Sequence, residues 1–208
     1  MVERFDRQLH TSGWYWLRLV QEDFCQATAT PPAMKYESER GPGLLDIARI
    51  LRGSVNRDAD LRCLLKAQLL FWMLAATDGH AKNFSIRLLS QGRFKLTPLY
   101  DVLSIWPVMG DGPDSIARHD ARLAMAVRGK NKHYLLKDIQ RRHFNATAAL
   151  CGLGESAEPL IGEVLAATPA VIATVQKDLP SGFPQHVLDA ILQGLMKSAK
   201  QLEAMPAA

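Results

Sequence analysis

The chain has 208 residues, of which 48% are hydrophobic and 22% charged, and its formal net charge is +4. This composition is typical of one globular domain, or of one large lobe of a larger protein, and excludes an intrinsically disordered chain. The small positive charge is compatible with a phosphate-bearing ligand, but by itself it does not indicate nucleic-acid binding.

The cysteine content and the apolar runs indicate the cellular setting. Cys25, Cys63 and Cys151 are far apart and form no Cys-x-x-Cys pair, which argues against a zinc or redox site. The longest apolar run, 69–76, is too short to span a bilayer, and residues 1–7 lack the apolar stretch of a secretion signal. We therefore expect a cytoplasmic protein with no contact to a membrane.

The first part of the chain predicts one strand, a long loop and two helices. Residues 2–7 alternate apolar and charged side chains, as in a short strand. The loop over 27–42 is rich in Thr, Pro, Glu and Gly, and long ordered loops are often functional. Helical spacing predicts a helix over 44–51 that stops before Gly53. A longer helix over 60–76 is apolar all round its second half, which predicts burial.

A β-hairpin is predicted next. Residues 84–89 and 93–96 have strand character and are joined by Ser90-Gln91-Gly92, with glycine at the turn. A tight hairpin returns the chain to its starting point. We therefore expect the residues before and after it to lie close together.

The rest of the chain is predicted to be helical. Helical patterns run over 134–150, from Ser156 onward with a break or kink at Pro169, and from Pro184 to near the C-terminus. The expected fold is thus mainly α, an α+β fold whose small β-hairpin lies beside the site.

The most informative motif is Asp78-Gly79-His80-Ala81-Lys82-Asn83, followed later by Tyr100-Asp101. Kinases use a catalytic base, a metal-holding Asn and a metal-holding Asp in this order. Phosphoryl transfer needs a carboxylate that orients the attacking hydroxyl and oxygen ligands that hold magnesium against the phosphates. Asp78 is the predicted general base, and the magnesium ligands would be Asn83 and Asp101.

Each of these residues also has an ordinary structural explanation. Asp-Gly is a common turn dipeptide, so Asp78 gains its meaning only from the spacing to Asn83 and Asp101. Lys82 is either a solvated loop charge or, as we expect, a contact to the transferring phosphate. For His80, we expect contact with a phosphate or with Asp78.

Two further interpretations concern charges. Asp101, beside the apolar Val102 and Leu103, would be costly to bury without a bound cation, which favours magnesium. A basic cluster is more often a solvated loop than a contact to nucleic acid or to an acidic partner. Its members are Arg128, Lys130, Lys132 and His133.

Several motifs together resemble the HipA family of bacterial toxin kinases, across essentially the whole chain. They are Val2-Glu3-Arg4-Phe5-Asp6-Arg7, Gln21-Glu22-Asp23-Phe24-Cys25-Gln26, Lys35-Tyr36-Glu37-Ser38, residues 77–85, residues 96–102 and Arg142-His143-Phe144. The resemblance implies a serine/threonine protein kinase with a protein-kinase-like fold related to the phosphatidylinositol kinases. It also implies a DNA-binding, HipB-like antitoxin, through which operator DNA would be bound, and an aminoacyl-tRNA synthetase as the substrate of the best-known relatives.

The resemblance assigns roles residue by residue. Asp78 matches the proton acceptor, and Asn83 and Asp101 match the magnesium ligands. The ATP-binding residues would be Glu3, Arg4 and Phe5 at an adenine-binding hinge, His80, Ala81, Lys82 and Asn83 in the nucleotide-binding loop, and Tyr100 beside Asp101. The expected organisation is one HipA-like lobe over 1–208, with a hinge at 1–7, a catalytic loop at 77–85, a metal-binding segment at 96–103 and a helical remainder over 132–208.

The sequence also departs from the family pattern. HipA-type kinases carry, before the hinge, a smaller lobe with a phosphate-covering loop and a phosphate-pairing lysine, and neither is found here. We expect the large lobe alone, as a fragment, a split protein or a decayed relative, with weak ATP binding and little turnover by itself. Two other functions stay open: a non-catalytic pseudokinase module that binds an antitoxin or DNA, and a small-molecule phosphotransferase.

Overall fold

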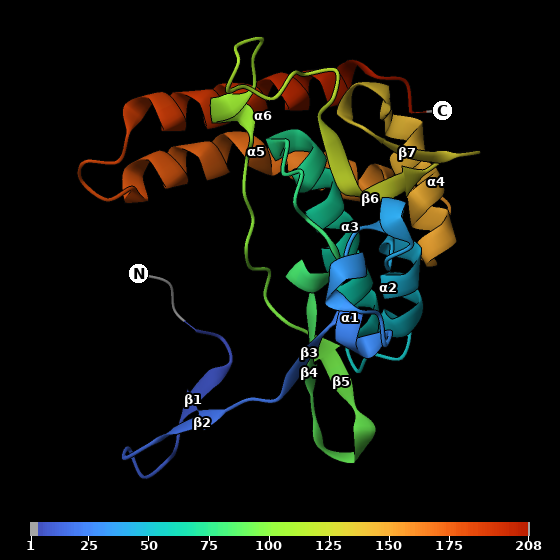
Figure 1. Cartoon of the computed structure of the whole chain (residues 1–208), viewed down its shortest axis with the longest axis vertical. Coiled ribbons are helices and arrows are strands. Elements are labelled where there is room, and N and C mark those ends of the chain that lie inside the picture. Colours follow the sequence, from blue (N-terminus) through green and yellow to red (C-terminus); the bar gives the residue numbers. More distant parts are fainter. Residues whose placement is uncertain (1–3, 208) are drawn as a thin grey trace.

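The computed structural model describes residues 4–207, which form a mainly helical body and three small antiparallel sheets, one of them apart from that body (Figure 1). The helices are α1 (Phe24–Ala27), α2 (Leu44–Leu51), α3 (Arg57–Leu74), α4 (Arg141–Cys151), α5 (Glu158–Asp178) and α6 (Gln185–Ala204). The strands are β1 (Arg7–Leu9), β2 (Trp16–Arg18), β3 (Gln21–Asp23), β4 (Ser85–Leu88), β5 (Phe94–Leu96), β6 (Arg122–Arg128) and β7 (Lys132–Leu135). The prediction of a mainly helical α+β fold is confirmed.

Helix α3 runs through the centre of the molecule and packs against α2, α4, α5, α6 and β6 (Figure 1). Leu65, Ala67 and Met73 are all at most 2% exposed, although they point in different directions round the helix. This confirms the predicted burial of the helix. Its start is three residues earlier than expected, and it ends at Leu74 because Ala75 adopts a left-handed backbone with φ 50°.

The predicted helix over 44–51 and the predicted β-hairpin are both confirmed. Strands β4 and β5 pair antiparallel, and the turn places Gln91 and Gly92 in the left-handed region, with φ 62° and 69°. The sequence did not reveal β3, which pairs with β4 and places Asp23 opposite Ser85. The three strands therefore form one sheet beside the Asp78–Asn83 motif.

Of the strand predicted over 2–7, residues 4–6 are not in a strand and only Arg7 is. Phe5 and Asp6 lie in a turn, β1 starts only at Arg7, and residues 1–3 are outside the described part of the chain. Strands β1 and β2 form a hairpin that lies apart from the helical body (Figure 1). Trp14 and Trp16 in this hairpin are 89% and 64% exposed.

The helical remainder predicted from residue 132 is wrong at its start. Residues 132–135 form β7, which pairs with β6, and helix α4 begins only at Arg141. The apolar run 123–127 of β6 is buried, and a short apolar run does not distinguish a buried strand from a helix. The break expected at Pro169 is also absent, since α5 is continuous across this exposed residue.

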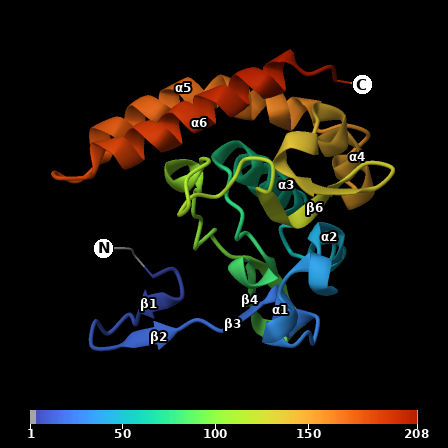
Figure 2. The same ribbon diagram turned by 45° about the horizontal axis from the view of Figure 1, so that its top comes forward.

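Helices α5 and α6 form a long pair that covers one end of α3 (Figure 2). By length and composition α5 could cross a membrane, with a mean hydropathy of 1.4 over its apolar window, although such a helix also occurs in soluble proteins. Gly194 in α6 lies against the ring of Trp106, where a Cβ atom would overlap the indole. This close contact holds the segment after Asp101 against α6.

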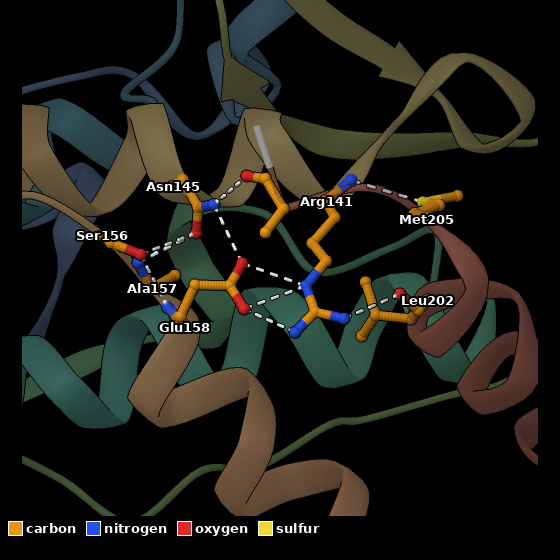
Figure 3. A network of polar contacts seen from close by, with 8 residues as sticks. Arg141, Asn145, Ser156, Ala157, Glu158, Leu202 and Met205 are labelled. Carbon is orange, nitrogen blue, oxygen red and sulfur yellow. Dashed lines mark hydrogen bonds and ion pairs between the residues drawn. The ribbon is translucent and has the colours of Figure 1, made fainter.

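A polar network connects the starts of α4 and α5 with the end of α6 (Figure 3). The guanidinium of Arg141 donates to both carboxylate oxygens of Glu158 and to the carbonyl of Leu202, and Asn145 also donates to Glu158. The side chain of Asn145 accepts from the backbone N–H of Ala157. The network thus ties the starts of α4 and α5 to the C-terminal end of α6.

This network predicts a pH-dependent contribution to stability. The hydrogen bond from Arg141 lowers the pKa of Glu158 below its ordinary value of 4.5, so the folded state favours the ionised carboxylate. Its contribution is therefore complete above pH 4.5 and is lost as the pH falls through the lowered pKa. Urea unfolding should show Glu158→Gln less stable than wild type at pH 7, with the difference shrinking below about pH 4. A difference that stays constant between pH 7 and pH 3 would contradict this prediction.

Candidate functional site

The Asp78–Asn83 motif follows the C-terminal end of the central helix α3. The segment that follows Asp101 caps this end: Ser104 Oγ donates to the carbonyl of Leu74, and the Trp106 indole N–H donates to the carbonyl of Met73. The backbone N–H of Ile105 donates to the carbonyl of Ala75. These bonds satisfy carbonyls that a helix end leaves without partners. They also fix the two halves of the predicted site relative to each other.

Position 79 requires glycine because its backbone lies against the ring of Phe71. A Cβ atom at this position would overlap the ring of Phe71, one turn before the end of α3. The backbone N–H of His80 then donates to the carbonyl of Asp78, and that of Asn83 donates to the carbonyl of His80. The loop is thus tightly folded against the core and presents the Asp78 carboxylate at its rim, where the side chain is 41% exposed.

The structure brings Asn83 and Asp101 together. Asn83 Nδ2 donates to Asp101 Oδ2 at 2.8 Å, as expected from the hairpin that separates them in sequence. Asp101 adopts a left-handed backbone with φ 56°, which is uncommon for a non-glycine residue, although Asp tolerates it better than most. Such backbone strain often lies at functional sites.

Asp101 is not buried by its apolar neighbours, so the prediction of a cation from burial is wrong. Asp101 is exposed, and the neighbouring side chains Val102 and Leu103 are 42% and 58% exposed. The apolar neighbours therefore do not cover the carboxylate. The case for a cation at Asp101 depends on its pairing with Asn83 instead.

The residues present fit a magnesium ion. Asn83 is 2% exposed, and its Oδ1 is buried without a hydrogen-bond partner in the part of the chain that the structure describes. A buried amide oxygen without a partner is costly unless it meets a donor or a cation. Residues 4–207 contain no group of three or more His, Cys, Asp or Glu residues suited to a metal ion. A magnesium ion held by Asn83 and Asp101 would thus need further oxygens from a ligand.

Asp78 lies in a second polar cluster. Its Oδ1 accepts a hydrogen bond from the Tyr36 hydroxyl at 2.7 Å and lies 3.7 Å from His80 Nε2. Burial lowers the pKa of His80 below its ordinary value, against the opposing effect of the Asp78 carboxylate, so the imidazole is neutral at pH 7. His80 therefore lies beside Asp78, and its proposed contact with a phosphate stays a prediction.

Lys82 and Ala81 are placed differently from what a ligand contact requires. The Lys82 ammonium binds the carboxylate of Asp23 at 2.6 Å, and this hydrogen bond raises its pKa. The carbonyl of Lys82 accepts from the Tyr100 hydroxyl at 2.7 Å. Ala81 is completely buried. The Lys82 side chain is 33% exposed but paired with Asp23, and Ala81 is buried, so their roles in catalysis and nucleotide binding stay predictions.

The predicted hinge and the metal-binding segment border the same cleft. The rings of Phe5 and Tyr100 lie 5.7 Å apart between centroids. A cleft of about 440 Å³ is lined by Arg4, Phe5, Asp6, Gln21, Pro98, Leu99, Tyr100 and Asp101. Glu3, the third predicted hinge residue, lies outside the described residues. The structure thus places Arg4 and Phe5 of the predicted hinge in one cleft with Asp101, the predicted metal ligand.

The basic cluster is largely engaged within the fold. The buried Glu37 carboxylate binds Lys132 at 2.8 Å and lies 4.0 Å from Arg128. The ring of His133 stacks on His143 with centroids 3.8 Å apart. This arrangement supports the structural explanation of the cluster over a nucleic-acid contact.

Sequence reasoning gave no role to Tyr36 or Asp23, the partners of the Asp78 carboxylate and the Lys82 ammonium. Both residues lie in motifs that carry the family resemblance, and this was the only signal that could have indicated them. Their contacts cross 42 and 59 positions of sequence, which no local pattern reveals.

Two known proteins are similar to this chain, one in sequence and one in structure. The chain is 40% identical over 127 residues to the Sinorhizobium fredii protein named "Putative kinase Y4mE", of which the match covers 30%. The fold is similar to that of HipA from Shewanella oneidensis, solved with HipB and operator DNA, with a TM-score of 0.78 and 21% identity. That match covers 97% of this chain and 48% of HipA, so the chain spans half or less of these relatives.

Residues 1–172 match the model of the HipA-like C-terminal domain. This match includes the Asp78–Asn83 motif, the hairpin and the segment of Asp101. With the shared fold, it shows that the chain belongs to the family of HipA-like C-terminal domains.

Proposed function

We propose that this chain is the ATP- and magnesium-binding catalytic lobe of a HipA-like serine/threonine protein kinase. The pairing of Asn83 with Asp101, together with the buried Asn83 oxygen that has no partner in residues 4–207, carries the proposal. A kinase needs an amide and a carboxylate at one cation, and a base on the same loop as the amide. The positions of Asp78, Asn83 and Asp101 support all three roles.

In the proposed reaction, each of these residues would have a separate role. Asp78, at the exposed rim of the loop, accepts the proton of the attacking hydroxyl. Asn83 and Asp101 hold the cation, and Phe5 and Tyr100 border the cleft for the base of the nucleotide. When bound, ATP would supply the phosphoryl group, and magnesium would neutralise charge on the phosphates. The neutral His80 lies beside Asp78 without adding a competing positive charge.

The partner and the substrate of this protein are proposed from its similarity to its relatives. The solved HipA is in a complex with HipB and operator DNA, so we propose a HipB-like antitoxin as the partner of this protein. A protein hydroxyl is the proposed acceptor, and an aminoacyl-tRNA synthetase is the first substrate to test. Since the chain spans about half of HipA, we expect the remaining phosphate contacts to come from a further lobe. Each such charged contact is worth roughly 1.5–3 kcal/mol, so the chain alone should bind ATP weakly.

A calorimetric titration tests the metal site without requiring turnover. ATP is titrated into wild type and Asp101→Asn, with and without magnesium. Asn keeps the left-handed backbone accessible and removes the charge. We expect magnesium to strengthen ATP binding in wild type, and the variant to lose roughly tenfold or more of this affinity, because it lacks one charged ligand.

The exposed Asp111 provides the matched control, and Asp111→Asn should bind as wild type does. Equal magnesium-dependent affinity in Asp101→Asn and wild type would remove Asp101 from the site. If wild type itself binds no nucleotide but does bind the antitoxin, the chain is a binding module and not a catalytic lobe.

A further inference from the structure

The Tyr36 hydroxyl is the one side-chain donor within hydrogen-bond distance of the Asp78 carboxylate among the described residues. It donates to Asp78 Oδ1 at 2.7 Å, and no hydrogen bond from residues 4–207 reaches Oδ2. A carboxylate held through one oxygen keeps a defined orientation and still offers its second oxygen to another donor. The attacking hydroxyl of a substrate is such a donor.

The loop that carries Tyr36 is anchored at this residue and at the residue that follows it. The carbonyl of Tyr36 accepts from the backbone N–H of Gly41 at 2.9 Å, and a Cβ atom at Gly41 would overlap the carbonyls of Met34 and Tyr36. Glu37, the next residue, is 9% exposed and accepts from the backbone N–H of Ala126 in β6 at 2.7 Å. Tyr36 is therefore held by the core rather than carried on a mobile loop.

The surroundings of the phenol fix its direction. The ring of Tyr36 meets the buried ring of His80 edge-on, with centroids 5.3 Å apart, and the Lys35 ammonium lies 5.0 Å from the Tyr36 ring centre. His80 Nε2 lies 3.7 Å from the Asp78 oxygen that Tyr36 binds. Tyr36 and His80 thus enclose one side of Asp78, while the carboxylate remains open on the other.

We propose that Tyr36 is a positioning residue, which holds Asp78 through Oδ1 and directs Oδ2 toward the acceptor hydroxyl. This inference rests on the proposed function, because it assigns Tyr36 a role in orienting the base of that reaction. A base that is misplaced by an ångström can lose a large part of its effect. A fixed donor behind the carboxylate prevents this loss.

The electrostatics of the phenol agree with a permanent donor. The hydrogen bond to Asp78 raises the pKa of Tyr36 above its ordinary value of 10, and burial adds to this effect. The phenol is therefore protonated at neutral pH and always able to donate. It does not compete with Asp78 for the substrate proton.

A kinetic experiment separates positioning from a structural role. Phosphoryl transfer is measured for the chain assembled with the small lobe, comparing wild type with Tyr36→Phe and with the control Tyr15→Phe, whose phenol lies on the exposed β1–β2 hairpin. We expect Tyr36→Phe to lower kcat by roughly 10- to 100-fold with the KM for ATP unchanged. Tyr15→Phe should leave both parameters unchanged. If kcat is unchanged in Tyr36→Phe, in an assay where wild type is active, the positioning role of Tyr36 is overturned while the proposed function stands.

A second measurement needs no activity. The chain is labelled with ¹³C at the tyrosine ζ carbon, and the phenol titrations of wild type and Asp78→Ala, which removes the acceptor, are followed by NMR. We expect the pKa of Tyr36 to lie above 10 in wild type and to fall toward 10 in the variant. Identical Tyr36 titrations in the two proteins would show that the contact does not exist and would overturn the inference. A wild type that shows the contact but transfers no phosphate overturns the proposed function, and with it the catalytic role of Tyr36.

Discussion

Asp78→Asn is expected to lower kcat for phosphoryl transfer by about 10²- to 10⁴-fold, the range typical for loss of a general base. The amide keeps the shape of the side chain and can still accept the hydrogen bond from Tyr36. It cannot accept the proton of an attacking hydroxyl. The effect should therefore appear in kcat, while magnesium-dependent ATP binding stays near that of wild type.

Transfer of radiolabelled phosphate, by the chain assembled with the small lobe, measures this effect. Asp114→Asn is a suitable control, because Asp114 is an exposed acid outside the site, and the same change of charge should leave the rate unaltered. The thermal unfolding midpoint of each variant shows whether the fold is preserved. If Asp78→Asn transfers phosphate at the wild-type rate, Asp78 is not the base.

Phe84→Ala is expected to lower the free energy of unfolding by about 3–5 kcal/mol, the cost of removing a buried Phe side chain. Phe84 is 1% exposed, and its ring lies 5.7 Å from that of Phe71, between the central helix and the loop of Asn83. Its carbonyl also accepts from the backbone N–H of Phe24, at the start of α1. A cavity here would loosen the support of the metal site as well as the core.

Urea unfolding followed by circular dichroism measures this loss. The matched control is Phe183→Ala, because Phe183 is 38% exposed in the connection between α5 and α6. We expect this variant to lose less than about 1 kcal/mol. Similar losses in the two variants would contradict the assignment of Phe84 to the core of the site.

Elements that depend on local interactions were predicted correctly, whereas elements that depend on contacts between distant segments were not. The helix over 44–51 and the hairpin with Gly92 are specified by local spacing and by one turn residue, and both were predicted correctly. The segment 132–135 was predicted as helix and forms β7, because its pairing with β6 outweighs the local pattern. The continuity of α5 across the exposed Pro169 likewise depends on how the whole helix packs.

The sequence by itself determined the order and spacing of Asp78, Asn83 and Asp101, and the turn that lets the last two meet. Only the tertiary structure decided that Tyr36 holds Asp78 and that Lys82 binds Asp23. The physical reason is that a hairpin brings its own ends together through local geometry. Contacts between distant segments depend on how the entire core packs, and no short stretch of residues encodes that packing.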